Sequence, residues 1–310
     1  MADPTPAARI SRDAPDYPSG LLDLTDPPAV LHVRGALAPA RCVAIVGSRS
    51  ATPYGLAFAR RLATDLSALG FAIVSGLARG IDAAAHLGAL DAGGVTLAVL
   101  PAGIDTVTPP SHGALAERIV ARGALLAERP VGTSVRPAMF VERNRLIAAL
   151  GCATIVVEAA VKSGAGSTAA VARTLGRPLL AVPGDVDRPT SRGCHALLRQ
   201  GALVCEGAGD VLRALSQDAS ALAPRRVAAC AARTERGPRA AAAADVAVDV
   251  PDAQRVVAAL AAQPRSVEAI ANDAALSVER VLAALLQLEW SSVADSHPGQ
   301  RWSLRGAPTK

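Results

Sequence analysis

The sequence predicts an α/β protein with an open parallel sheet domain and a small C-terminal winged-helix domain. From residue 43 to about 215, short β-branched runs alternate with longer segments rich in Ala and Leu. Such a βαβα rhythm gives a parallel sheet with right-handed crossovers. After residue 250 the pattern restarts as three short helices and a hairpin, which is typical of a winged helix.

The predicted strands are short, and several are continuous apolar runs. Such runs are expected for parallel strands that are covered on both faces. A helix is predicted over residues 55–69, between the first two strands. The strands are predicted at residues 43–46, 71–75, 95–100, 124–128, 154–158, 178–182 and 202–204.

The chain is predicted to divide into four parts. Residues 1–40 form an N-terminal lead-in, and residues 41–216 form the sheet domain. Residues 217–249 are rich in Ala and Arg with little apolar periodicity, which favours a flexible linker. Residues 250–310 form the winged-helix-like domain.

The C-terminal helices have clear starts, since Ser266 and Ser277 are placed as N-caps. The third helix, 277–289, is the candidate recognition helix. It carries Arg280 against Glu279 and Glu289, whereas a DNA-reading helix should be basic. We therefore expect a module that contacts protein or dimerises.

Composition indicates an anionic partner and a cytoplasmic location. The net charge is +5, and Lys162 and Lys310 are the only lysines, so arginine supplies the excess. The five cysteines have no C-x-x-C spacing and are expected to be reduced. The start has no apolar h-region, and no stretch is long and apolar enough to span a membrane.

The informative loops follow the strands. Glycine-containing loops follow five of them and would all lie at the carboxyl edge of one sheet, where open α/β sheets bind ligands. Small residues there let a ligand approach the backbone, and helix N-termini present free N–H groups to anions. The sequence therefore predicts an anion groove built from G-S-R-S (47–50), S-G-L-A-R-G-I-D (75–82), P-A-G-I-D (101–105), K-S-G-A-G-S-T (162–168) and P-G-D (183–185).

Cations and hydroxyls accompany these loops. Ser167 and Thr168 stand where a helix would start, and arginines and a lysine fall in or beside the loops. The candidate DNA- or phosphate-binding residues are Gly47, Ser48, Arg49, Gly76, Arg79, Gly80, Phe140, Arg143, Asn144, Arg145, Lys162, Ser163, Gly164, Gly166, Ser167 and Thr168.

The stretch F-V-E-R-N-R-L-I (140–147) is interpreted as a helix start. Residues two apart on a helix point about 200° apart. Either Arg143 or Arg145 therefore faces the groove and meets phosphate, while the other braces Glu142, Glu158 or the sheet edge. Asn144, near the cap, would satisfy free backbone donors.

A nicotinamide enzyme is an alternative. G-A-G-S-T-A (164–169) fits G-x-G-x-x-A, with Asp185 about 20 residues on, but it follows the fifth strand after a five-residue spacer. No P-loop motif occurs.

Catalytic and metal sites are not expected. The histidines are scattered without metal-ligand spacing, and no nucleophile–base pair stands out. Asp82 and Glu158 are interpreted as structural, with Asp82 bracing the loop after the second strand and His86 able to pair with it. We expect no cofactor, no metal and no enzyme activity.

Six ordered motifs resemble the DNA-processing protein A family, also called Smf. The resemblance runs over residues 17–215, and the tail resembles the winged-helix module of that family. Its motifs are G-S-R-x-x-T-x-Y-G (47–55), S-G-L-A-R-G-I-D-A-A-A-H (75–86), L-A-V-L-P-A-G-I-D (97–105), F-V-E-R-N-R-L-I-A-A-L (140–150), V-V-E-A with S-G-A-G-S-T-A (156–169), and G-R-P-L-L-A-V-P-G-D (176–185).

The resemblance implies an extended Rossmann-like domain over 41–216 that binds single-stranded DNA. The family protects incoming strands in natural transformation, loads the recombinase RecA, works as a homodimer and is not known to turn over a substrate. Where the family has S-G-S-L-I-T this chain has S-G-A-G-S-T. The upstream helix-hairpin-helix domain of many members has no room before residue 17.

A DNA strand needs cations for its phosphates and a flat group for its bases. Arg49 and Lys162 are expected to bind phosphate, and Phe140 to stack a base or pack in the core. A second alternative is a nucleotide phosphoribohydrolase of the lysine-decarboxylase-like group, whose P-G-G-x-G-T loop is matched only loosely here.

Overall fold

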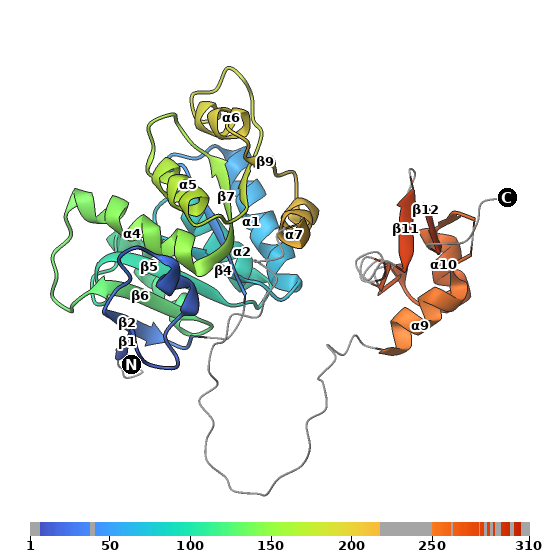
Figure 1. The fold of residues 1–310 in the computed structure, drawn as a ribbon, viewed down its shortest axis with the longest axis horizontal. Coiled ribbons are helices and arrows are strands. Elements are labelled where there is room, and N and C mark those ends of the chain that lie inside the picture. The colour runs from blue at the N-terminus through green and yellow to red at the C-terminus, as the bar shows by residue number, and fades with distance from the viewer. Residues whose placement is uncertain are drawn as a thin grey trace, which may run out of the picture. The chain divides into compact units, whose positions relative to one another are not determined.

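The fold comes from a computed structural model, in which the chain divides into two compact units, Met1–Ala232 and Arg233–Lys310 (Figure 1). Each unit is described by itself. Of the predicted linker, only Gln217 belongs to the described residues. The structure describes residues 7–37, 41–217 and 250–304, the last range with gaps at 262, 279, 282–283, 286–287, 289–292 and 298–300.

A single sheet is the framework of the first unit. In the described part of this unit it has nine strands in the order β1-β2-β6-β5-β4-β3-β7-β8-β9. The strands from β3 to β9 pair in parallel, as predicted. The strands are β1 (Ala8–Ser11), β2 (Val30–Gly35), β3 (Cys42–Gly47), β4 (Ala72–Ser75), β5 (Thr96–Gly103), β6 (Ala124–Arg129), β7 (Gly151–Glu158), β8 (Leu179–Ala181) and β9 (Leu203–Val204).

The sheet differs from the prediction at one edge. β1 and β2 lie in the stretch predicted only as a lead-in, and both pair antiparallel, β2 with β6 and β1 with β2 (Figure 1). The open sheet is therefore mixed rather than wholly parallel. No local pattern announces this pairing, because the partner of β2 lies about 90 residues further along the chain.

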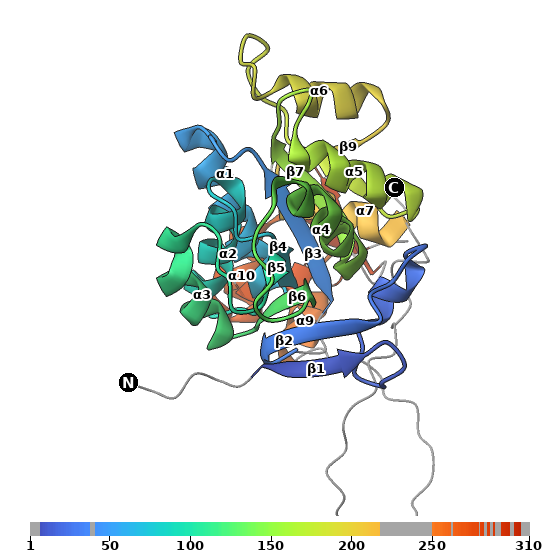
Figure 2. The ribbon, with the colours of Figure 1, turned by 90° about the vertical axis from the view of Figure 1, so that its left-hand side faces the viewer.

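Helices cover both faces of the sheet, since the strands are apolar on both sides. Figure 2 shows α1, α2 and α3 on one side of the strands and α4 and α5 on the other. Alternate residues of β3 divide between the two cores: Val43 and Ile45 pack with α1 and α2, and Ala44 and Val46 with α4 and α5. The helices are α1 (Pro53–Ala68), α2 (Ile81–Asp91), α3 (Gly113–Val120), α4 (Pro137–Leu150), α5 (Gly164–Thr174), α6 (Arg192–Arg199) and α7 (Ala208–Gln217), with 3-10 turns η1 (Ser19–Asp23) and η2 (Pro110–His112).

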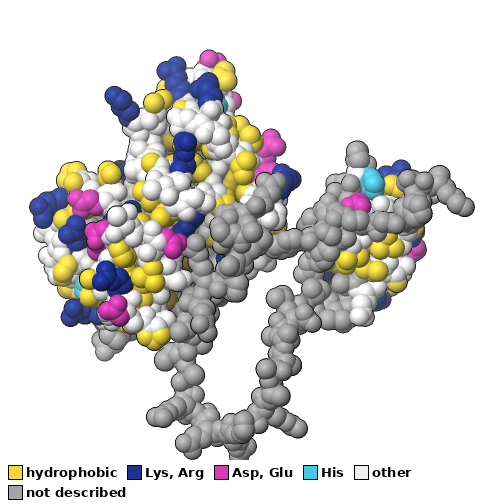
Figure 3. Space-filling model, viewed as in Figure 1, with side chains coloured by type: hydrophobic (Ala, Val, Ile, Leu, Met, Phe, Trp, Pro, Cys, Tyr) yellow, Lys and Arg dark blue, Asp and Glu magenta, His cyan; other side chains and the backbone are white. Residues whose placement is uncertain are grey.

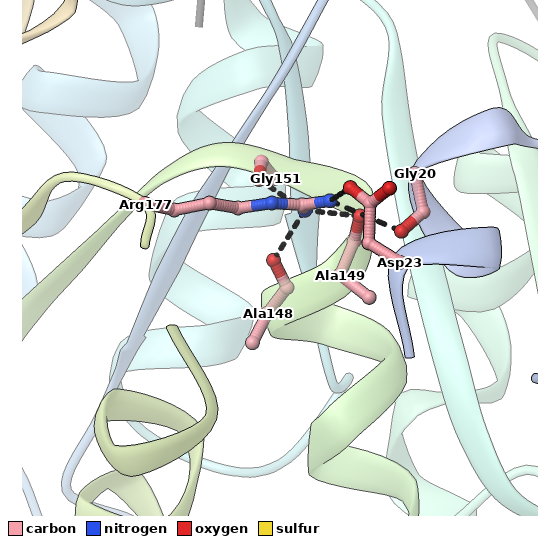
Figure 4. A network of polar contacts seen from close by, with 6 residues as sticks. All are labelled: Gly20, Asp23, Ala148, Ala149, Gly151 and Arg177. Carbon is pink, nitrogen blue, oxygen red and sulfur yellow. Dashed lines mark hydrogen bonds and ion pairs between the residues drawn. The ribbon is translucent and has the colours of Figure 1, made fainter. Parts of the chain in front are cut away.

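Arg177 joins the lead-in to the core (Figure 4). Its side chain is buried, and its Nη2 donates to Asp23 Oδ2 at 2.7 Å and to Gly20 O at 3.0 Å. Carbonyl groups at a helix C-terminus have no partner within the helix, and a guanidinium satisfies them well. From Nη1, Arg177 donates to the carbonyl oxygens that end α4, those of Ala148, Ala149 and Gly151.

The second unit has its own core around Trp302 and Val256. Ser266 accepts a hydrogen bond from Ala269 N at 3.3 Å, which confirms the predicted N-cap. The predicted third helix, 277–289, lies partly outside the described residues. The described elements are α9 (Val250–Ala259), β10 (Arg265–Ser266), α10 (Val267–Ala274), β11 (Ala294–His297) and β12 (Arg301–Leu304), with sheet order β10-β12-β11.

The described cysteines, Cys42, Cys152, Cys194 and Cys205, are free. Burial raises the thiol pKa of Cys42, Cys194 and Cys205 to about 12, which indicates structural rather than reactive thiols. None of the described helices combines the length and the apolar character that crossing a membrane requires.

Candidate functional site

The site lies where the chain reverses its direction along the sheet. β3 and β7 are neighbours, yet the chain continues from β3 to β4 on one side and from β7 to β8 on the other. The loops after β3 and β7 therefore diverge, and such a switch point opens a crevice at the carboxyl edge. Gly47 ends β3 opposite Glu158, and a Cβ at Gly47 would lie 2.6 Å from Ile81 Cγ1, so only glycine fits there.

A groove of about 580 Å³ opens at this point. It is walled by the loop after β3, the first half of α4 and the start of α5. Of the five predicted loops, those at 47–50, 75–82 and 162–168 contribute lining residues. The loop at 101–105 does not line the groove, and residues 183–185 line another cavity. Of the residues predicted as binding or structural, those that line it are Gly47, Ser48, Arg49, Asp82, Phe140, Arg143, Asn144, Ser163, Gly164 and Thr168.

Arg49 and Phe140 form the outer part of the groove. The Arg49 guanidinium carbon lies 4.6 Å from the centre of the Phe140 ring, a cation–π contact. Arg49 is exposed and Phe140 is partly exposed, so the pair offers a positive charge beside a flat ring. The packing of Phe140 against Arg49, rather than in the core, leaves part of the ring available to a ligand.

Arg143 forms the floor of the groove and is only 4 % exposed. Its Nη1 donates to Val99 O, and its Nε has no hydrogen-bond partner among the described residues. Burial lowers the pKa of Arg143 to about 10, while Asp82 raises it and Arg49 lowers it. A Cβ on Gly76 would collide with this guanidinium, which explains the glycine.

Asp82 lies beneath the same floor and braces the second loop. Its Oδ2 accepts hydrogen bonds from Gly76 N at 3.1 Å and Ala78 N at 3.4 Å. Burial raises the pKa of Asp82, and the charge of Arg143 opposes that rise. The predicted pairing of Asp82 with His86 is wrong, because His86 Nδ1 lies 2.7 Å from Thr96 Oγ1.

Asn144 lies within α4 rather than near its cap, because the helix begins three residues before Phe140, at Pro137. Its Nδ2 donates to Gly164 O at 3.0 Å and to Ser167 Oγ at 2.9 Å. Asn144 therefore ties α4 to the start of α5 instead of satisfying the backbone donors of its own helix.

The start of α5 lines one side of the groove. Ser167 Oγ donates to Gly164 O at 2.7 Å and accepts from Asn144 Nδ2, so its hydroxyl is engaged within the protein. Thr168 is buried, with 1 % of its surface exposed. Ser163 Oγ is buried without a hydrogen-bond partner among the described residues. The first-turn N–H groups of α5 are then the donors best suited to a phosphate.

The remaining predicted cations lie around the groove rather than in its wall. Arg145 Nη2 pairs with Glu128 Oε1 at 2.6 Å, so Arg145 braces the end of β6. Arg79 and Lys162 are exposed, and among the described residues neither forms an ion pair. On the face shown in Figure 3, basic and acidic side chains are interspersed.

The steric constraints that require glycine differ among the predicted glycines. Gly80 has a φ of 77°, and a Cβ there would collide with Ser48 O, so this glycine lets the second loop cross the first. Gly166 faces open space and has no steric reason to be glycine.

A second cavity, of about 430 Å³, lies at the ends of β7 and β8. Glu158 belongs to its wall and holds Thr52, the N-cap residue of α1: its Oε2 accepts from Thr52 N at 2.9 Å and its Oε1 from Thr52 Oγ1 at 2.5 Å. Gly55 leaves room for this carboxylate, since a Cβ there would lie 2.6 Å from Glu158 Cδ. Sequence reasoning identified Glu158 as structural but missed this cavity and Tyr54 at its rim.

Metal and dinucleotide sites find little support in this geometry. The described residues contain no cluster of His, Cys, Asp or Glu suited to a metal ion. Asp185, the acidic residue of the dinucleotide alternative, pairs with Arg188 at 2.6 Å in the second cavity.

Family models match both units. The model of the DNA recombination-mediator protein A family matches residues 8–216, and a DprA winged helix domain matches residues 238–300. A putative DNA processing protein DprA of Mycobacterium tuberculosis is 51 % identical over 174 residues, 56 % of this chain and 44 % of the relative. Protein Smf of Escherichia coli is 35 % identical over 301 residues, 96 % of this chain and 78 % of the relative.

Two solved structures are similar to the first unit. DNA processing protein A of Streptococcus pneumoniae superposes with a TM-score of 0.64 at 36 % identity, covering 66 % of this chain and 73 % of that one. The Helicobacter pylori protein, which has a single-stranded DNA binding mode, superposes with a TM-score of 0.61 at 29 % identity, covering 68 % and 96 %.

Proposed function

The chain belongs to the DNA recombination-mediator protein A family, and from that premise we propose that it binds and protects single-stranded DNA in the groove. The observation that carries the proposal is the meeting of Arg49, Phe140 and the start of α5 at one hollow. The similar protein of Helicobacter pylori binds single-stranded DNA. The chain aligns with less than half of the Mycobacterium tuberculosis relative, so its activity is proposed from its own groove.

In the proposed mode each part of the groove has one task. Phosphates lie against Arg49, Lys162 and the N-terminus of α5, where charge and free N–H groups favour anions. A base stacks on the exposed part of the Phe140 ring, which is a sequence-tolerant contact. Arg143 adds positive potential from below, since its one described hydrogen bond is to a carbonyl oxygen and the groove holds two arginines against the single carboxyl of Asp82.

Asn144 stays in the proposed site as the residue that ties α4 to the start of α5. The other predicted residues stay in it as positions that shape the loops and the start of α5: Gly47, Ser48, Gly76, Gly80, Ser163, Gly164, Gly166, Ser167 and Thr168. Arg79 stays in it as an exposed cation beside the groove, and Arg145 as the residue that braces α4 against Glu128. The protein would act as a binder and not as an enzyme.

The test is fluorescence anisotropy with labelled single- and double-stranded oligonucleotides over a range of salt concentrations. We expect preference for the single strand. Arg49→Ala and Lys162→Ala should each weaken binding to all sequences by a similar factor and lower the salt slope by about one. Arg61→Ala is the matched control, because Arg61 also lies over a ring, that of Phe58, outside the groove.

Unchanged affinity and salt slope in both groove variants would contradict the proposed site. Equal binding of single and double strands would contradict the proposed preference.

Family membership also supports two finer proposals. We propose that the chain works as a homodimer and helps to load RecA during natural transformation. Light scattering tests the first, with a monomer mass at all concentrations as the contrary outcome. RecA filament formation on DNA coated with single-strand binding protein tests the second, and no acceleration by this chain would contradict it.

We further propose the four-part organisation with the linker at 217–249 and a winged helix that contacts protein rather than DNA. Binding of duplex DNA by residues 250–310 alone would contradict the latter.

A further inference from the structure

The second cavity adjoins the groove along the same sheet edge. Gly47 of the groove and Glu158 of the cavity wall are register partners on adjacent strands, which lie about 5 Å apart. That spacing is shorter than the step from one nucleotide to the next in a stretched strand. A strand held in the groove by its phosphates therefore passes within reach of the cavity.

The groove and the second cavity are lined by net charges of opposite sign. The groove is lined by two arginines against one aspartate, Asp82. The cavity is lined by Glu158 and Asp185 against Arg188, and Asp185 and Arg188 pair with each other at 2.6 Å. The carboxylate of Glu158 thus sets the local potential, and a phosphate would be repelled. The part of a nucleotide that suits this cavity is its base.

The walls of the cavity fit a flat ring. Val157, Val182, Pro183 and Cys194 form apolar walls, and the ring of Tyr54 stands at the rim with 54 % of its surface exposed. The volume of about 430 Å³ lies within the ordinary range of small-ligand sites, roughly 300–1,000 Å³. Tyr54 offers a face on which a base can stack.

Glu158 has acceptor capacity left for a base. A carboxylate accepts about four hydrogen bonds, and Thr52 donates two of them, from its backbone N–H and its hydroxyl. A carboxylate accepts readily from the exocyclic amino group of a base such as cytosine. The O4 carbonyl of uracil or thymine presents only lone pairs at that position, so it would face the carboxylate unfavourably.

We infer that the second cavity is a base-binding subsite that takes a base with an exocyclic amino group, recognised by Glu158 and stacked on Tyr54. The inference rests on the proposed binding of single-stranded DNA and adds a preference to it. Phosphates bind in the groove without regard to sequence, and one base in the bound stretch is read in the cavity.

Oligonucleotides of deoxycytidine and deoxyuridine test the inference, because the two bases differ at position 4 and neither carries the thymine methyl group. Anisotropy titrations are run with both at slightly alkaline pH, where cytosine is not protonated. We expect the full chain to bind oligo(dC) about tenfold more tightly than oligo(dU), the worth of a hydrogen bond to a charged group.

Variants of Glu158 and Tyr54 test whether the ratio of oligo(dC) affinity to oligo(dU) affinity depends on the cavity. In Glu158→Gln the amide keeps an acceptor for Thr52 N and a donor for Thr52 Oγ1, so the cap of α1 survives while the charge is lost. We expect the ratio to fall to about one. Tyr54→Ala should lower the ratio as well, whereas Tyr54→Phe keeps the ring and should preserve it. Tyr54 lies on the surface, so its variants fold even if Glu158→Gln does not.

The outcomes separate the two proposals. Tight binding of both oligonucleotides without a preference, or a preference that survives Glu158→Gln and Tyr54→Ala, would overturn the base subsite and leave the groove in place. Absence of binding to either oligonucleotide would overturn the proposed function together with the subsite.

Discussion

Two buried arginines lie in or against α4, and they differ in how far their hydrogen bonds are satisfied within the protein. Arg177 donates to five acceptors, among them the carbonyls that end the helix and the carboxylate of Asp23 (Figure 4). Arg143, in the first half of the helix, has a single described hydrogen bond, to Val99 O. Both are less than 10 % exposed, so burial does not distinguish them.

The difference teaches how to separate a structural arginine from one that serves a ligand. A buried charge is expensive unless it is hydrogen-bonded, and Arg177 donates five hydrogen bonds within the protein. Arg143 lines an open groove with a single described hydrogen bond, and its neighbour Asp82 is itself buried. Such incompletely compensated charge is expected at functional sites rather than in a core.

The largest expected effect is that of Arg177→Met on stability. The change removes the guanidinium that donates to the carbonyls at the end of α4 and to Asp23. We expect the first unit to lose about 3–5 kcal/mol of unfolding free energy. Urea unfolding followed by far-UV circular dichroism measures the loss.

The second unit provides an internal control for that experiment, because both tryptophans, Trp290 and Trp302, belong to it. The fluorescence transition should stay where it is in the wild-type chain. Asp23→Asn should cost under about 1 kcal/mol, since the Asp23 side chain is 41 % exposed. Equal losses of unfolding free energy for Arg177→Met and Arg143→Met would contradict the distinction between a structural arginine and one that serves a ligand.

Arg143→Met should show the opposite balance, with a small effect on stability and a large one on binding. An apolar side chain of similar length avoids the desolvation of the guanidinium, so we expect a change of about 1 kcal/mol in unfolding free energy. Single-stranded DNA affinity should fall about tenfold. The double variant Arg143→Met with Asp82→Asn should recover stability but not affinity. Recovery of both would mean that Arg143 acts on Asp82 alone.

Phe140→Ala should weaken single-stranded DNA binding by roughly tenfold, because a stacked base contributes about 1–3 kcal/mol. Phe140→Tyr keeps the ring and should retain most of the affinity, whereas Phe140→Leu should behave like alanine. The unfolding free energy should change little, since the ring is partly exposed. If leucine binds as well as phenylalanine, the ring packs and does not stack.

The smallest expected effect is a pH dependence from Asp82. Burial raises its folded-state pKa, so the folded protein holds this proton more tightly than the unfolded chain does. The stability that Asp82 contributes is therefore present at acidic pH and is lost as the pH rises through the raised pKa of Asp82 in the folded protein. Urea unfolding at several pH values should show this slope in the wild-type chain relative to Asp82→Asn, and parallel curves would contradict it.

Loop positions could be predicted because each follows a recognisable strand. The alternation of strands and helices alone predicts that residues 47–50 and 162–168 lie at one edge of the sheet. The structure places both there. The direction of each side chain could not be predicted. Ser167 and Asn144 stand at plausible anion-binding positions but bond to each other and to Gly164 O, because α4 starts earlier than the apolar pattern indicates.

Three features could be read from the sequence alone: the layered α/β fold, the parallel strands β3 to β9 and the edge of the sheet at which the candidate site lies. These follow from local periodicity and from glycine and cation chemistry at strand ends. Only the tertiary structure decided that β1 and β2 add an antiparallel edge, that Arg143 is buried while Arg49 is exposed, and that Arg145 pairs with Glu128. Those outcomes depend on which distant groups meet, and neither spacing nor composition contains that information.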